Sequence, residues 1–301
     1  MSSFNRAAVD AICADVVGRR NEIDVVVAAL AAERHVLLEG PPGTGKSSLL
    51  RALAHASGVE LVFVEGNAEL TPARLVGTFD PARVLTDGYS AEVFLDGPLV
   101  DALRTGSLLY IEEINRVPEE TLNVIITAMS ERELNIPRLG RVVAEPGFRV
   151  VAAMNPFDAI GTARISSAVY DRVSRVAMGY QSEAEETEIV AREAKGAGNG
   201  PVGRRAVRVV RATREHSDLR VGSSVRGAID LSLIAEQLAA LRELDVTNEE
   251  LGLDAALAAL SGRIRVREGS GRSPEAIVRE LWAAHPLETD DPEAESSPGK
   301  A

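Results

Sequence analysis

The feature that most constrains this chain of 301 residues is the segment Gly40-Pro41-Pro42-Gly43-Thr44-Gly45-Lys46-Ser47. It fits the pattern G-x-x-x-x-G-K-[ST] at every position, and it stands between an apolar run and a helical pattern, residues 35–39 and 47–57. Glycines let backbone N–H groups close around phosphate oxygens, a lysine neutralises them, and a serine hydroxyl binds Mg²⁺. The overlapping Gly43-Thr44-Gly45 is not a dinucleotide fingerprint, because Ser48 stands where a third glycine is required. The segment therefore predicts a phosphate-binding loop between a strand and a helix.

The runs that follow this loop indicate the fold class. Short β-type runs alternate with helical patterns as far as about residue 180, and near-continuous apolar strands of this kind are typical of a parallel sheet covered on both faces by helices. We therefore expect an α/β core. The expected strands are residues 35–39, 60–64, 108–112, 149–154 and 173–178.

Two interruptions of the core pattern predict hairpins. Asp87-Gly88 supplies the positive φ angles of a two-residue turn between residues 82–85 and 89–95. The second hairpin spans residues 133–148 and turns near Leu139-Gly140. Each is either a projection from the sheet or an ordinary surface hairpin.

A composition change marks a second domain. The Gly-rich segment 195–203 is interpreted as a linker, and the helical patterns 204–216, 223–244, 248–260 and 273–284 follow it. Residues 285–301 are acidic and rich in Pro and Ser, which is typical of a disordered tail. We expect an α/β core over residues 1–195, an all-helical domain over 196–284 and the tail over 285–301.

Polar residues follow two of the expected strands. Glu112 and Glu113 end the run 108–112, where one carboxylate can lie near Mg²⁺ and another can polarise an attacking water. Asn155 ends the run 149–154, where its amide either holds that water or forms a turn with Pro156. Joined to the loop upstream, these residues predict a site for phosphoryl chemistry.

Arginines near the end of the core are candidates for stabilising charge on a transferred phosphate, a role often supplied by a neighbouring subunit. Arg164, Arg172 and Arg175 form a basic cluster, for which the alternative is a solvated or ion-paired face. Arg226 is expected in the first turn of a helix of the second domain, from which it could reach phosphate.

Charge and cysteine content exclude several classes of protein. The net charge of −12 repels nucleic-acid backbones unless a local basic patch overrides it. Cys13 is the only cysteine, which excludes an internal disulfide and fits a reducing cytosol. No signal peptide or membrane-length apolar run is found, so a cytoplasmic, non-membrane protein is expected. The four histidines lack the spacing of metal ligands, so we do not expect them to bind a metal.

Taken together, these residues resemble the AAA+ ATPases and, within them, the MoxR family, from about Ala14 to about Leu260. The resemblance rests on ordered motifs at these positions: Asp15-Val16-Val17-Gly18-Arg19, His35 through the loop to Ser47, Gly97-Pro98, Glu113-Ile114-Asn115-Arg116, Ala153-Met154-Asn155-Pro156, Tyr170-Asp171-Arg172 and Gly222-Ser223-Ser224-Val225-Arg226.

The resemblance implies roles for individual residues, with ATP and Mg²⁺ as cofactors. Glu113 is implied to be the general base, Asn155 sensor 1, Arg172 the finger acting on a neighbour's nucleotide, and Arg226 sensor 2. Ser47 and Glu112 are implied to serve the metal, and the two hairpins to face the pore of a ring. The nucleotide-contacting positions it implies are Val17, Gly18, Pro42, Gly43, Thr44, Gly45, Lys46, Ser47 and Ser48.

Two positions depart from the family pattern. The metal-side acid is usually aspartate, but Glu112 is longer by one methylene, and an outer-sphere role tolerates that change because Mg²⁺ keeps several of its waters. Val173 stands where the family usually has phenylalanine, so the finger is either Arg172 or Arg175.

The resemblance implies a homo-oligomeric, hexameric ring whose ATP hydrolysis remodels or matures a protein client, as chaperones that insert metals do, beside a partner with a von Willebrand factor A (VWA) domain. One alternative is a nucleotide-gated scaffold with weak hydrolysis, which Glu112 keeps open. Another is a nucleic-acid motor that uses the locally basic helix 204–214, although the acidic whole makes nucleic acid a disfavoured partner. A GTPase is disfavoured because no Asn-Lys-x-Asp motif occurs. A small-molecule kinase is disfavoured because it would not need Arg226 and a C-terminal helical domain in this arrangement.

Overall fold

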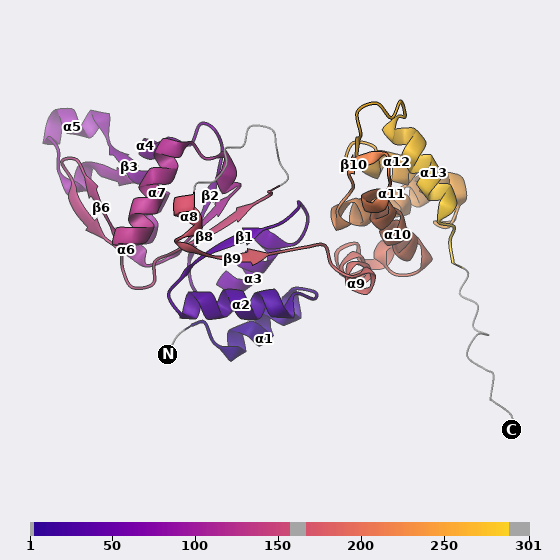
Figure 1. Ribbon diagram of the computed structural model, residues 1–301, viewed down its shortest axis with the longest axis horizontal. Coiled ribbons are helices and arrows are strands. Elements are labelled where there is room, and N and C mark those ends of the chain that lie inside the picture. The colour runs from indigo at the N-terminus through magenta and orange to yellow at the C-terminus, as the bar shows by residue number, and fades with distance from the viewer. Residues whose placement is uncertain (1–2, 157–166, 289–301) are drawn as a thin grey trace, which may run out of the picture. The chain divides into compact units, whose positions relative to one another are not determined.

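The computed structural model describes residues 3–156 and 167–288, so Arg164 and most of the expected acidic tail lie outside the described residues. The chain divides into two compact units, Met1–Gly179 and Tyr180–Ala301, and each is described by itself (Figure 1). In the described part of the chain, none of the helices combines the length and the apolar character required to cross a membrane.

The first unit is built on a parallel sheet of five strands, as the sequence predicts (Figure 1). The strand order is β2-β5-β8-β1-β9, so the strands that precede the loop, the two acids and Asn155 are neighbours or next neighbours. In register, Glu39 of β1 lies beside Met154 of β8, and Glu65 of β2 beside Glu112 of β5. The strands are β1 (His35–Glu39), β2 (Leu61–Glu65), β5 (Leu108–Glu112), β8 (Arg149–Met154) and β9 (Val173–Ala177).

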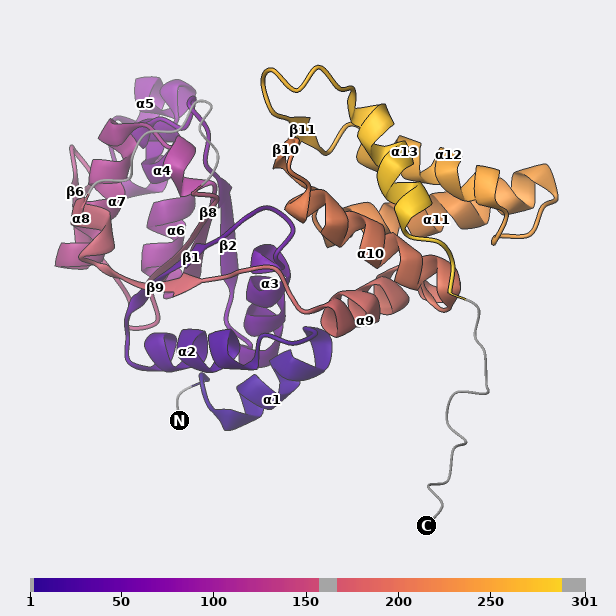
Figure 2. The ribbon, with the colours of Figure 1, turned by 45° about the vertical axis from the view of Figure 1, so that its right-hand side comes forward.

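Helices cover both faces of this sheet, which explains the continuous apolar strands. Val36 and Leu38 pack with α1–α3, whereas Leu37 between them packs with the helices of the other face (Figure 2). Thr71 and Pro72 open α4, and Asn5 caps α1 by accepting a hydrogen bond from the Ala8 N–H. The helices are α1 (Arg6–Asp15), α2 (Arg20–Ala31) and α3 (Lys46–Ser57) on one face, and α4 (Pro72–Val76), α6 (Pro98–Thr105) and α7 (Glu119–Glu131) on the other.

The predicted hairpin around Asp87-Gly88 is wrong. Residues 81–87 form the helix α5 (Pro81–Asp87), because Asp80 caps it through the Ala82 and Arg83 N–H groups and proline occupies its first position. Gly88 therefore ends a helix instead of turning a hairpin. Residues 77–96 are called the α5 insert below. Its two strands, β3 (Gly77–Phe79) and β4 (Phe94–Asp96), flank α5 in the sequence and pair antiparallel, and the short helix η1 (Ala91–Val93) precedes β4.

The second predicted hairpin is confirmed. Strands β6 (Glu133–Ile136) and β7 (Gly140–Val143) pair antiparallel between α7 and β8. Arg138 in its turn lies over the Tyr89 ring, 3.8 Å from the ring centroid, so the hairpin contacts the α5 insert.

The second unit is helical, as expected, but it begins earlier than residue 196. Helix α9 (Glu183–Glu193) already belongs to it, and the expected linker is the short helix η3 (Lys195–Gly198) followed by the start of α10 (Pro201–Glu215). A Cβ at Gly198 would lie 2.1 Å from the Val190 carbonyl oxygen, so this glycine serves close backbone packing and not flexibility. The remaining elements are α11 (Val225–Arg242), α12 (Glu249–Leu260), α13 (Pro274–Ala284) and an unpredicted two-stranded sheet, β10 (Leu219–Val221) with β11 (Arg265–Val266).

A buried histidine makes the stability of the first unit sensitive to pH. His35 is 8% exposed; its Nδ1 accepts a hydrogen bond from the Val150 N–H at 2.9 Å, and its Nε2 donates to the Met129 carbonyl oxygen at 3.3 Å. Burial, together with nearby arginines, lowers the pKa of His35 from 6.5 to about 4. The folded state thus holds the ring neutral where the unfolded state takes up a proton.

Because the folded pKa lies below the unfolded one, this stability is present above pH 6.5 and is lost as the pH falls toward 4. Between pH 7 and pH 5 we expect His35 to account for about 2 kcal/mol of the change in the free energy of unfolding. Urea unfolding at pH 7 and pH 5 measures this change. The free energy of unfolding of His35→Gln should fall by that amount less than the free energy of the wild type does. His55→Gln, at an exposed position, is the control and should behave like the wild type. Equal losses in all three proteins would contradict this assignment.

Candidate functional site

The segment Gly40–Ser47 forms a loop between the end of β1 and the start of α3. Gly43 and Gly45 take left-handed backbone angles, with φ of 73° and 82°, which favour glycine. Gly40 is required for a different reason, since a Cβ there would lie 2.0 Å from the Met178 carbonyl oxygen. Gly45 brings no side chain to the N-terminus of α3, whose first amide N–H groups have no partner within the helix and are suited to bind an anion.

Backbone carbonyl groups of the loop hold its lysine in place. The Lys46 ammonium donates to the carbonyl oxygens of Gly40 and Pro41, each at 2.8 Å, and the Thr44 hydroxyl donates to the same Pro41 oxygen at 2.9 Å. The positive charge therefore lies over the loop that is predicted to take phosphate. Pro42 lies within this loop, and Ser48 lies in the first turn of α3.

The two residues predicted to serve a metal are in direct contact. The Ser47 Oγ donates to Glu112 Oε1 at 2.7 Å, which joins the start of α3 to the carboxyl end of β5. A hydroxyl and a carboxylate are hard oxygen ligands, so the residues present fit Mg²⁺.

Glu113 directly follows β5 and begins a turn of the chain. Its backbone is left-handed, with φ of 53°, and it opens the short helix η2 (Ile114–Arg116). The Glu113 carboxylate pairs with Arg116 at 2.9 Å and is 38% exposed. Gly66 makes room for this turn, because a Cβ there would lie 2.5 Å from the Glu113 carbonyl oxygen. Nothing in the local sequence around Gly66 indicates this role.

Asn155 follows β8, which is the neighbour of β5. The buried Asn115 joins the two strand ends, since its Nδ2 donates to the Asn155 carbonyl oxygen at 3.4 Å. Asn115 belongs to the motif Glu113-Ile114-Asn115-Arg116, but the sequence alone indicates no separate role for it. Lys46, Glu112, Glu113 and Asn155 are thus brought together at the carboxyl edge of three neighbouring strands.

Residues 15–19, the first motif of the family resemblance, contact the segment beside the loop. The buried Arg19 donates to the Gly179 carbonyl oxygen at 2.5 Å, one residue beyond the Met178 carbonyl against which Gly40 packs. Gly18 has a left-handed φ of 68°, and Val17 is 8% exposed. Val17 and Gly18 are therefore tied to the segment beside the loop, while their contact with adenine stays a prediction.

The two candidate finger arginines, Arg172 and Arg175, make different contacts. Arg172 comes after α8 (Ser167–Tyr170) and donates to Ser130 Oγ at 2.5 Å and to the Ala168 carbonyl oxygen at 2.7 Å. It precedes β9, which runs parallel to β1, so it lies at the opposite edge of the sheet from its own loop, about 15 Å away along the strand. Arg175 instead binds Glu39 through two contacts at 2.5 and 3.0 Å.

Arg226 belongs to the second unit, where it is exposed in the first turn of α11. Its contact with phosphate stays a prediction.

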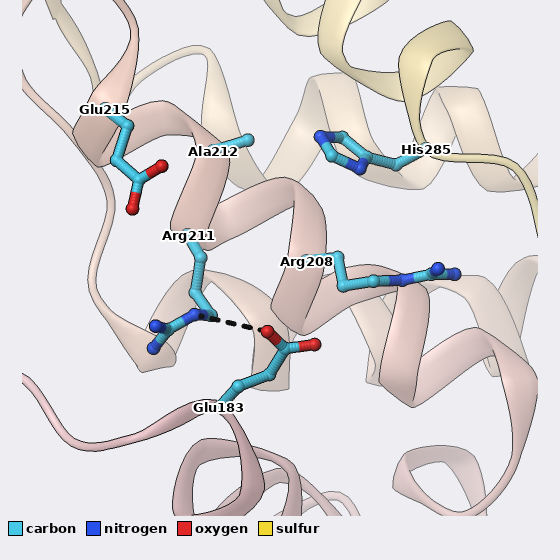
Figure 3. A pocket seen from close by; sticks show the side chains of 6 residues that line it. All are labelled: Glu183, Arg208, Arg211, Ala212, Glu215 and His285. Carbon is cyan, nitrogen blue, oxygen red and sulfur yellow. Dashed lines mark ion pairs between the residues drawn. The ribbon is translucent and has the colours of Figure 1, made fainter.

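The basic helix α10 uses its arginines within the second unit. Arg211 pairs with Glu183 at 3.7 Å and with buried Glu186 at 3.2 Å, and Arg214 pairs with Glu186 at 2.8 Å. Figure 3 shows Arg208 and Arg211 among the residues that line a pocket, together with Glu183, Glu215 and His285. Arg208 pairs with Glu288 as well. These carboxylates offset the positive charge that a nucleic-acid interface would require.

The loop, the paired acids and the five-stranded parallel sheet define a P-loop nucleoside-triphosphatase core. Residues 35–173 match the family model of the AAA domain, dynein-related subfamily. This part of the chain is therefore similar to AAA domains, and the first unit has the P-loop AAA fold.

Relatives and solved structures agree with this fold. Uncharacterized protein YeaC of Bacillus subtilis is 28% identical in an alignment of 307 positions that covers 92% of each chain. An uncharacterized protein of Staphylococcus epidermidis is 34% identical over 149 residues, and the match spans 49% of this chain and 56% of that relative.

Two solved structures share the fold at low identity. A Cytophaga hutchinsonii protein provisionally assigned as an ATPase has a TM-score of 0.52 and 21% identity, with 94% of each chain covered. RuvB, the Holliday junction branch migration motor of Thermotoga maritima, has a TM-score of 0.53 and 19% identity over 81% of this chain and 70% of that one.

Proposed function

We propose that this protein is a MoxR-type AAA+ ATPase that couples ATP hydrolysis, in a homo-oligomeric ring, to remodelling or maturation of a protein client. One observation carries the proposal: the loop with Lys46, the Ser47–Glu112 pair, Glu113 and Asn155 converge at one edge of the sheet. Nucleotide binding and water activation require these groups at one place.

Each residue has a chemical role in this proposal. Lys46 and the first amides of α3 bind the phosphates, and Ser47 with Glu112 would hold Mg²⁺. When bound, Mg²⁺ would offset the charge of the β- and γ-phosphates. Glu113 accepts the proton of the attacking water, and Asn155 orients that water. Glu113 must exchange its contact with Arg116 for the water as it does so.

The position of Arg172 favours a site shared between subunits. Because Arg172 lies at the sheet edge opposite its own loop, it serves a nucleotide only if that nucleotide is bound by a neighbour. On this basis we propose a homo-oligomeric ring, with six subunits as the resemblance to the MoxR family implies. Arg226 of the helical unit is proposed as a further phosphate contact.

The client side of the proposal rests on the motifs that resemble the MoxR family. We propose that the protein acts on a protein client, in a role that includes metal insertion. It would do so beside a partner with a VWA domain. The proposed location is the cytoplasm, where ATP is available. The internal ion pairs of α10 make a nucleic-acid substrate the weaker choice.

A subunit-mixing experiment tests the shared site. Arg172→Ala and Lys46→Ala should each abolish most phosphate release, by about 100-fold or more, since each removes a charge that acts on the phosphates. When the two variants are mixed, some sites combine an intact loop with an intact arginine, and activity should partly return. No recovery at any mixing ratio would contradict the role of Arg172 in a neighbouring site, and Arg175→Ala in place of Arg172→Ala tests the alternative finger.

A further inference from the structure

A tyrosine lies directly beneath the residues that would hold the metal. Along β5, Leu109 and Ile111 pack with the helices of one face, whereas Leu108 and Tyr110 pack with α1–α3 on the other. Side chains of a strand alternate between faces, so Glu112, two residues after Tyr110, emerges on the same face. Tyr110 is 2% exposed and has no part in the chemistry described so far.

Tyr110 contacts the site through a chain of two hydrogen bonds. Its hydroxyl donates to Ser47 Oγ at 3.2 Å, and Ser47 Oγ donates to Glu112 Oε1 at 2.7 Å. A phenol with its ordinary pKa of about 10 keeps its proton at neutral pH, so the Tyr110 hydroxyl is a donor. Phe63, its in-register neighbour on β2, packs against the Tyr110 ring with 5.5 Å between centroids and limits its movement.

These contacts restrict how Ser47 can act. A hydroxyl has one proton and two lone pairs. Its proton is taken by Glu112 and one lone pair by Tyr110, which leaves one lone pair for a cation. A ligand whose other bonds are fixed is preorganised, and such second contacts commonly tune metal affinity.

We propose that Tyr110 is a positioning residue that orients the Ser47 hydroxyl, and through it the long Glu112 side chain, for Mg²⁺ in the nucleotide complex. The inference rests on the proposed nucleotide binding. It also explains how glutamate can replace the usual shorter aspartate, because the tyrosine and serine fix where the longer carboxylate ends.

The test compares nucleotide affinity with and without Mg²⁺. A fluorescent, non-hydrolysable ATP analogue is titrated into full-length wild type and Tyr110→Phe, once with MgCl₂ and once with EDTA. We expect Tyr110→Phe to weaken binding by about 3- to 10-fold with Mg²⁺, as the loss of one hydrogen bond predicts, and to leave binding in EDTA unchanged. Tyr89→Phe, which removes a hydroxyl from a half-exposed ring of the insert, should match the wild type in both buffers.

A second variant separates positioning from packing. If Tyr110 acts through Ser47, then adding Tyr110→Phe to Ser47→Ala should cause no further loss with Mg²⁺. An equal loss in both buffers, a wild-type result for Tyr110→Phe, or additive losses in the double variant would each overturn the inference while nucleotide binding itself stands. Failure of the wild type to bind the analogue in either buffer would overturn the proposed function and the inference together.

Discussion

Replacing Glu113 with glutamine is expected to slow phosphate release at saturating ATP by about 100-fold or more, the usual contribution of a general base. Glutamine has nearly the same shape but cannot take a proton from water. Glu113 leaves β5 through a left-handed turn and pairs with Arg116, whereas Glu112 is the carboxylate that contacts Ser47. The substitution therefore removes a proton acceptor without removing a proposed metal ligand. ATP should therefore bind almost as before, stay unhydrolysed and stabilise the proposed ring.

Glu120→Gln is the matched control, because it makes the same change at an exposed position in the first turn of α7. Phosphate release measured with a coupled assay should be normal for this variant. An unchanged rate for Glu113→Gln would contradict the assignment of the base. A wild-type rate as low as that of Glu113→Gln would instead favour a nucleotide-gated scaffold.

Glu249→Ala is expected to lower the free energy of unfolding of the helical unit by about 3 kcal/mol, because it leaves a buried charge without its partner. The Arg205 side chain is 1% exposed and binds both oxygens of Glu249 at 2.6 Å. Its guanidinium also stacks 3.5 Å from the Trp282 ring centroid and donates to the Trp282 carbonyl oxygen. Since the Glu249 side chain is 63% exposed, we expect a loss at the lower end of the usual range for buried pairs.

Trp282 is the only tryptophan of the chain, so its fluorescence during urea unfolding reports this unit. Glu250→Ala, the next residue and an exposed one, changes the same first turn of α12 and should cost less than about 1 kcal/mol. Equal stabilities for the two variants would contradict the importance of the Arg205 pair.

The sequence predicted which residues meet at one edge of the sheet, because its signals are local. The loop motif, the apolar strands and the polar residues at their ends each lie within a few residues, and parallel strands bring their carboxyl ends together. The contacts of Tyr110 and Asn115 could not be predicted in this way, since they join segments far apart in the chain.

Two predictions from the sequence were wrong, the hairpin at Asp87-Gly88 and the linker at residues 195–203, and each has a physical cause. Asp80-Pro81 is a helix start that outweighs the turn signal of Asp87-Gly88. The glycines of residues 195–203 looked like a flexible linker, but Gly198 allows the backbone of η3 to pack against α9. Only the tertiary structure distinguishes a glycine required for close packing from one in a flexible segment.

Calorimetric titration of the purified protein with ATP tests the central claim most directly, with Mg²⁺ and with EDTA, beside Lys46→Ala. We predict saturable binding by the wild type, tighter with Mg²⁺, and its loss in the variant, since Lys46 places its charge over the loop. Absence of heat from the wild type in both buffers, or equal affinity of Lys46→Ala, would contradict the assignment of this loop as the nucleotide site.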